Sequence, residues 1–131
     1  MANTFSSKQV ADETGLSVHT LRYYEQIGLT DDIARDENGY RLYSESDLTW
    51  FQVLSYFRSM GMSIKEIQQF IALKKGEVST ITARREFIEI YRGKVIDQIK
   101  ELEDTLKKVD YKILFFKGLE SSAEVKGSSE D

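Results

Sequence analysis

Residues 6–28 read SSKQVADETGLSVHTLRYYEQIG and hold two helix starts separated by a glycine. Ser6 and Gln9 have the spacing of a capping box, in which each side chain bonds the backbone N–H of the other residue. Gly15 is the residue type that commonly ends a helix, and Ser17 follows it in position to cap the next one. The segment therefore predicts two short helices joined by a tight turn.

The two predicted helices have the residue pattern of a helix-turn-helix. Ala11 is a small residue in the first helix, and Val18 and Leu21 give the second helix an apolar side. Small and apolar residues at these places let two helices cross closely. The rest of the second helix carries side chains suited to phosphates and base edges. They are His19, Thr20, Arg22, Tyr23 and Tyr24.

The pattern changes between residues 33 and 43, where two short runs flank Asn38-Gly39. An Asn-Gly pair supplies the positive φ angles that a tight hairpin turn needs. The segment therefore predicts a short β-hairpin that is rich in Tyr and Arg.

Two further capping boxes follow the hairpin. Ser44 with Asp47 opens a helix that stops at Gly61, and Ser63 with Glu66 opens another. Lys74-Lys75-Gly76 suits the end of that last helix, because cations favour a helix C-terminus. A compact first unit is thus expected over residues 1–76.

From about Thr80 to Phe116 the sequence predicts one long helix with a heptad seam of apolar residues. The seam cannot be covered by the small first unit, so a second copy of the chain is the expected partner. Residues 77–120 are predicted to be this dimerisation helix with a short effector region, and the polar tail 121–131 is predicted to be disordered. The predicted dimerisation residues are Ile88, Val95, Ile99, Leu102, Leu106, Val109, Ile113 and Phe116.

The composition of the 131 residues argues against several classes of enzyme. The chain has no Cys and one His, which removes thiolate ligands and Cys nucleophiles and makes a His-based metal cluster improbable. No nucleophile–base pair or carboxylate pair occurs at a telling spacing, so neither an enzyme nor a metal or cofactor site is expected. No apolar run approaches a bilayer span, and no signal peptide begins the chain. A cytoplasmic location without membrane contact is expected.

The net charge of −4 argues at first against nucleic acid as a partner. Residues 1–75 hold 8 Lys plus Arg and 10 Asp plus Glu, so even the first unit lacks a basic surplus. However, many of the acids lie at helix starts or in the segment before the hairpin, whereas cations fall on the second helix, on the hairpin and in residues 58–75. The local sign of the potential can therefore differ from the sum.

A series of short motifs runs through residues 4–75. They are TLRYYE (20–25), Gly28-Leu29, Arg35, GYR-x-Y (39–43), Asp47-Leu48 and R-x-x-GMS-x-x-EI (58–67). In this order and spacing they resemble the MerR family of bacterial transcription regulators. The resemblance implies a mainly α-helical fold with a small β-hairpin. It implies a winged helix-turn-helix, with the helix-turn-helix at about 6–28, the hairpin wing at about 33–43 and a second wing at about 58–75. A long antiparallel coiled-coil dimerisation helix would follow.

In that family the homodimer grips a pseudo-palindromic double-stranded promoter operator. An inducer makes the dimer distort the DNA, so that RNA polymerase can engage. Matching motifs place DNA contacts on the recognition helix and both wings, in agreement with the chemistry of Arg and Tyr toward phosphates and bases. The expected contacts are Ser17, His19, Thr20, Arg22, Tyr23, Tyr24, Arg35, Tyr40, Arg41, Tyr43, Arg58, Ser63 and Lys65.

Several alternatives stay open at this stage. One of Tyr23 and Tyr24 could be a core aromatic residue, and Arg22 could form an ion pair with Glu25 or Glu13. The family usually has a proline after Gly28-Leu29, and this chain has none there. The chain also lacks the cysteines with which some members of the family sense metals or oxidants. A small-molecule effector is possible, and the sequence does not identify it. An effector-independent architectural DNA binder and a coiled-coil interaction module are the alternative functions.

Overall fold

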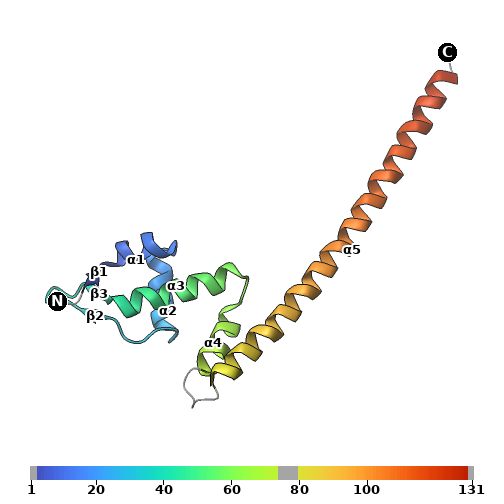
Figure 1. Ribbon diagram of the computed structural model, residues 1–131. Helices are drawn as coiled ribbons and strands as arrows, with labels where there is room; N and C mark the ends of the chain where they lie inside the picture. Colours follow the sequence, from blue (N-terminus) through green and yellow to red (C-terminus); the bar gives the residue numbers. More distant parts are fainter. Residues whose placement is uncertain (1–2, 74–79, 130–131) are drawn as a thin grey trace. The chain divides into compact units, whose positions relative to one another are not determined.

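The structure, a computed structural model, describes residues 3–73 and 80–129. The chain divides into two units with the boundary between Arg84 and Arg85. The first unit contains a mixture of short helices and strands, and the second continues one long helix (Figure 1). The elements are β1 (Thr4–Phe5), α1 (Ser7–Thr14), α2 (Val18–Gln26), β2 (Ala34–Arg35), β3 (Arg41–Ser44), α3 (Glu45–Ser59), α4 (Ile64–Leu73) and α5 (Thr80–Ser129).

The helix-turn-helix forms as its capping residues predict. Ser6 and Gln9 make the reciprocal capping box at the start of α1. Gly15 ends α1 with φ at 75°, a left-handed conformation that glycine adopts at no steric cost. Ser17 caps α2 by accepting a hydrogen bond of 3.0 Å from the backbone N–H of Thr20. The predicted helix pair is confirmed.

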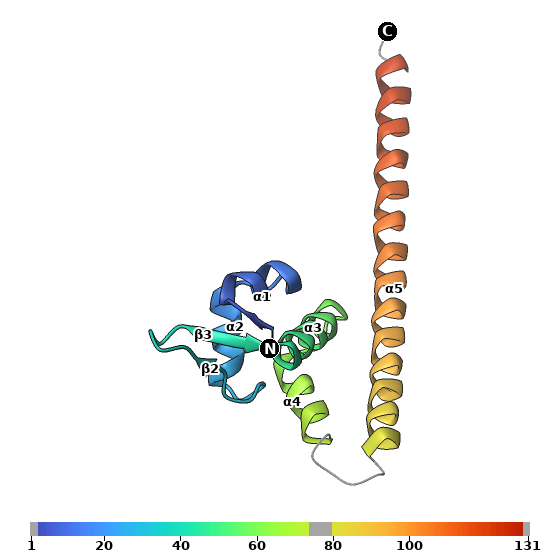
Figure 2. The ribbon, with the colours of Figure 1, turned by 60° about the vertical axis from the view of Figure 1, so that its left-hand side comes forward.

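The hairpin is part of a three-stranded antiparallel sheet with the order β1-β3-β2. Phe5 of β1 pairs with Tyr43, and Arg35 of β2 pairs with Arg41. Strand β1 was not predicted, because two residues are too short to show the alternation that marks a strand. The turn between β2 and β3 projects away from the helices of the first unit (Figure 2).

The hairpin turn differs from the one that Asn38-Gly39 predicts. Of the two residues Asn38 and Gly39, only Gly39 has a positive φ, at 84°. The carboxylate Oδ1 of Asp36 accepts hydrogen bonds of 2.9 Å from the backbone N–H groups of Asn38 and Tyr40, which holds Asn38 in an ordinary conformation. A hydrogen bond from Gly39 N to Asp36 O completes a three-residue loop with a glycine bulge, instead of the two-residue turn.

The core of the first unit lies between the helices and one face of β3. Tyr43 packs edge-on against Phe51, with ring centroids 5.8 Å apart. The hydroxyl of Ser55 donates a hydrogen bond of 2.8 Å to the carbonyl oxygen of Thr14, which joins α3 to the end of α1. These contacts fix the helix-turn-helix on α3. The fully buried side chains are Val10, Leu21, Tyr43, Phe51, Leu54, Met62 and Ile67.

Helix α5 has 50 residues and a length of about 75 Å. It continues past the predicted end at Phe116, and the prediction of a disordered tail is wrong for residues 121–129, which are helical. The chain contains no proline, and single glycines such as Gly118 weaken a helix by only about 1 kcal/mol. The end of α4 predicted at residues 74–76 lies outside the described residues.

Candidate nucleic-acid interface

Helix α2 has a buried side and an exposed side. Leu21 and Tyr24 are buried, with Leu21 inaccessible and Tyr24 4% exposed. His19, Arg22 and Tyr23 are exposed, with Tyr23 at 44%. Their spacing along the helix places these three side chains on the solvent side, as the predicted recognition helix requires.

The two tyrosines of α2 therefore have different roles. Tyr24 is a core residue, so its prediction as a DNA contact is corrected in favour of the alternative that one of the pair is buried. The preceding Tyr23 points its ring to solvent because adjacent helical residues are 100° apart around the axis. Tyr23 is the tyrosine available to a ligand of α2.

Arg22 forms no ion pair or hydrogen bond within the described residues, which removes the pairing with Glu25 or Glu13 as its role. The carboxylate of Glu25 pairs instead with Arg41. At the start of α2, the hydroxyls of Ser17 and Thr20 lie 2.8 Å apart and bond to each other. These two predicted contacts are thus held in place by the helix cap.

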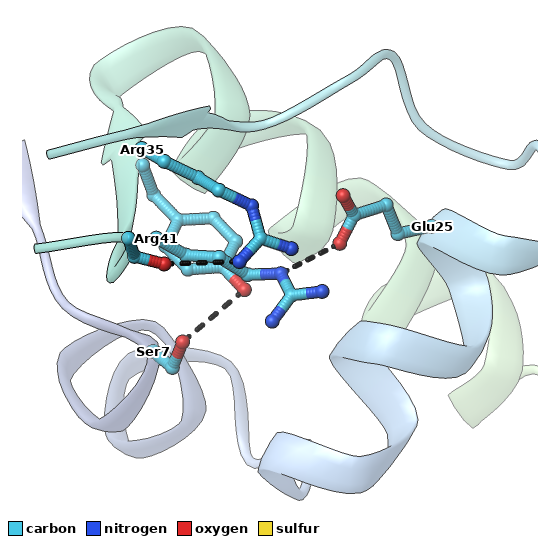
Figure 3. Close-up of polar contacts among 6 residues, drawn as sticks. Ser7, Glu25, Arg35 and Arg41 are labelled. Atoms are coloured by element: carbon cyan, nitrogen blue, oxygen red, sulfur yellow. Dashed lines mark hydrogen bonds and ion pairs between the residues drawn. The ribbon is translucent and has the colours of Figure 1, made fainter.

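The hairpin wing presents Tyr40, which is 72% exposed, and two arginines. The Nη1 atom of Arg35 donates a hydrogen bond of 2.9 Å to the carbonyl oxygen of Gly39, so the side chain folds back along the turn. The Nε atom of Arg41 donates to Oε2 of Glu25 at 2.9 Å, which ties β3 to α2 (Figure 3).

The structure places Tyr43, which the sequence predicts as a DNA contact, in the core. Its side chain is fully buried, and its hydroxyl lies 3.4 Å from the Oγ of Ser7 as a weak hydrogen-bond partner. Side chains alternate between the two faces of a strand, and Tyr43 lies on the face of β3 that points to the core. There it packs against Phe51 of α3. Tyr43 is therefore a core residue beneath the hairpin wing, and the prediction that it contacts DNA is corrected.

The predicted second wing, at about 58–75, covers the end of α3, the turn that follows it and α4. Arg58 holds this turn through a hydrogen bond from Nη1 to the carbonyl oxygen of Met62. Ser63 forms the predicted capping box, since its N–H donates to Glu66 Oε1 at 3.0 Å and its Oγ accepts from the N–H of Glu66 at 3.1 Å. The capping box therefore uses the backbone N–H groups of Ser63 and Glu66. Lys65 is exposed on the first turn of α4.

Sequence reasoning missed the ion pair that Glu25 forms. Its partner Arg41 lies 16 positions away on another element, and only the tertiary fold brings the two together.

Among residues 3–73 and 80–129, no group of three or more potential ligands could hold a metal ion. Within the same ranges, no helix is long and apolar enough to cross a bilayer.

The geometry of the first unit agrees with comparisons to known proteins. The sequence model of the MerR HTH regulatory protein family matches residues 5–74, more than half of the chain. The chain belongs to the MerR family. The predicted family and the fold class, a winged helix-turn-helix followed by a long helix, are confirmed.

MerR relatives match along nearly the whole chain. An uncharacterized HTH-type transcriptional regulator of Haemophilus influenzae is 32% identical over 123 residues, which cover 94% of this chain and 91% of the relative. HiNmlR, a MerR family regulator lacking the sensor domain, was solved bound to promoter DNA. It is 33% identical, with a TM-score of 0.67 and coverage of 88% of this chain and 87% of that one.

A MerR family regulator from Listeria monocytogenes has a TM-score of 0.66 to this chain, at 33% identity and with 83% of each chain covered. The relatives are named as transcriptional regulators. This chain is accordingly a DNA-binding transcription regulator of the MerR type.

Proposed function

We propose that the protein binds a pseudo-palindromic promoter operator as a homodimer and distorts it to control transcription. The observation that carries this proposal is the exposed side of α2, where Arg22 and Tyr23 face solvent. Within the described residues, Arg22 forms no ion pair that would hold it away from a ligand. Arginine offers a rigid fork to phosphate or guanine, and tyrosine donates its hydroxyl to phosphate. Each protomer would place one α2 in the major groove of one half-site.

The wings would add contacts on either side of α2. Tyr40 and Arg35 lie at the exposed hairpin turn, and Lys65 lies on the first turn of α4. Contacts of this kind fix the register of a protein on the duplex without reading its sequence. The solved relative HiNmlR, bound to promoter DNA, supports this mode of action.

Dimerisation through α5 is supported by its apolar seam. Leu102 and Leu106 are 69% and 59% exposed, so these side chains have no cover within one chain. A seam with alternating spacings of three and four residues is typical of coiled coils. A second α5 would cover it, and the two-fold axis of the dimer would match the symmetry of the operator.

Control of transcription would follow from the shape imposed on the DNA. The protein would affect RNA polymerase by distorting the promoter DNA. It would convert no substrate, so it acts as a regulator and not as an enzyme. A bacterial promoter as target also implies a cytoplasmic location. Two modes of control fit this kind of binding: binding that depends on a small-molecule effector, and effector-independent architectural binding.

DNA footprinting tests the proposal. The probes are the DNA upstream of the gene and duplexes that the wild-type protein selects from a random library. The expected result is two symmetric protected half-sites, which Arg22→Ala and Tyr23→Ala weaken and which Lys100→Ala on α5 leaves intact. Unchanged protection by both α2 variants would show that the assigned surface is wrong. A stable dimer that selects no duplex would favour the coiled-coil interaction module.

A further inference from the structure

The ion pair between Glu25 and Arg41 joins the recognition helix to the hairpin wing. The Nε of Arg41 lies 2.9 Å from Oε2 of Glu25, and the two side chains are 19% and 18% exposed. A partly buried, charge-assisted hydrogen bond holds both groups in one geometry more firmly than an exposed ion pair does. The pair therefore fixes how the guanidinium of Arg41 is presented.

The contact leaves most donors of Arg41 unused. Glu25 bonds only Nε, and within the described residues Nη1 and Nη2 have no hydrogen-bond partner. In Figure 3 the dashed line from Glu25 ends on Nε, and the two terminal nitrogens carry none. Those terminal nitrogens form the fork that binds phosphate.

We propose that Glu25 is a positioning residue for DNA binding, which orders Arg41 so that its terminal nitrogens are ready to bind the DNA backbone beside α2. This inference rests on the proposed function and deepens it. A carboxylate on the DNA-facing helix is otherwise unfavourable, because it repels phosphate. Its presence is explained if it orders an arginine that binds phosphate.

Replacing Glu25 should change the affinity for DNA in opposite directions, depending on whether the residue acts only through its charge or by positioning Arg41. Removing one negative charge from each α2 reduces repulsion and on that ground tightens binding to any duplex. Removing the acceptor of Arg41 Nε frees a long side chain, which must then be immobilised on binding at a cost in affinity. The sign of the change separates the two effects.

The test measures affinity by fluorescence anisotropy at one salt concentration, with the full chain and a duplex that the wild-type protein selects from a random library. Glu25→Ala is expected to weaken binding about fivefold or more, since two side chains in the dimer lose their order. Glu25→Gln keeps an oxygen that can accept from Nε and is expected to stay within about twofold of wild type.

A double-mutant cycle distinguishes positioning from general damage to the fold. In an Arg41→Ala background, Glu25→Ala should not weaken binding further. An equal loss in both backgrounds would show that Glu25 acts on the fold and would overturn the proposal. So would an Arg41→Ala variant that binds like wild type, or a Glu25→Ala variant that binds as tightly as wild type or more tightly.

The failure of this inference can be told apart from failure of the proposed function. A wild-type protein that selects no duplex refutes operator binding, and the role of Glu25 falls with it. A wild-type protein that selects a duplex, with Glu25→Ala unchanged in affinity, refutes only the role of Glu25.

Discussion

The indole Nε1 of Trp50 donates a hydrogen bond of 2.8 Å to the carbonyl oxygen of Leu29. Leu29 lies in the segment between α2 and strand β2 of the hairpin wing, and Trp50 belongs to α3. The sequence has Thr30-Asp31 where the family usually has a proline that stiffens this entry. The hydrogen bond from Trp50 therefore supplies a tertiary restraint at the place where a local one is missing.

Replacing Trp50 by Phe should lower the stability of the first unit. The substitution keeps an aromatic ring but leaves the carbonyl of Leu29 without this donor, which costs about 1 kcal/mol. We expect the midpoint of thermal unfolding to fall by about 3–6 °C, measured by circular dichroism at a fixed protein concentration.

The control for this change is Tyr56→Phe, which removes a hydroxyl from an exposed ring of the same helix. It should leave the midpoint unchanged. Equal midpoints for Trp50→Phe and Tyr56→Phe would show that the hydrogen bond to Leu29 adds nothing to stability.

Tyrosines on opposite faces should respond differently to loss of the hydroxyl. Tyr23→Phe removes a donor from the exposed side of α2 and should weaken operator binding by about threefold to tenfold, as loss of a hydrogen bond predicts. Tyr43→Phe removes a hydroxyl from the core and should leave affinity within twofold. Titrations of a labelled operator duplex measure both, and a larger loss for Tyr43→Phe would reverse the assignment.

Local signals predicted the helices of the first unit well. The capping boxes of Ser6, Ser44 and Ser63 form as their spacing indicates, because each involves residues only three positions apart. Gly15 ends α1 for an equally local reason, since its positive φ suits glycine. Such features depend on neighbours in the sequence and can be read from it.

Features that depend on distant residues could not be read in this way. The sequence motif treats Tyr23 and Tyr24 alike, but packing of α2 on the core decides which of them is exposed. The assignment of Tyr43 failed because its burial depends on Phe51 of α3. The ion pair of Arg41 likewise needs the fold to place β3 beside α2.

The salt dependence of binding should report the phosphate contacts of individual cations. The first unit lacks a basic surplus, so we expect a modest slope of log affinity against log salt. Lys65→Ala should reduce the magnitude of that slope by about 2, because the dimer loses one contact in each protomer. Anisotropy titrations between about 50 and 200 mM KCl measure it.

The matched control for Lys65 is Lys100, which is exposed on α5. Lys100→Ala should leave the slope unchanged. If both lysine variants reduce it equally, the effect comes from total charge and not from a phosphate contact at the second wing.

Two substitutions on α5 test the dimer seam with the same new residue. Leu106 lies in the seam and is 59% exposed in the single chain, whereas Ile90 lies off the seam and is 76% exposed. Leu106→Asp would bury two charges against the partner helix, so the dimer should dissociate to monomers at micromolar concentration. Ile90→Asp adds an equal charge to solvent and should leave a dimer.

Sedimentation equilibrium measures the two masses. A Leu106→Asp variant that stays dimeric would exclude this part of the seam from the interface, and loss of operator binding by the monomer would link dimerisation to function.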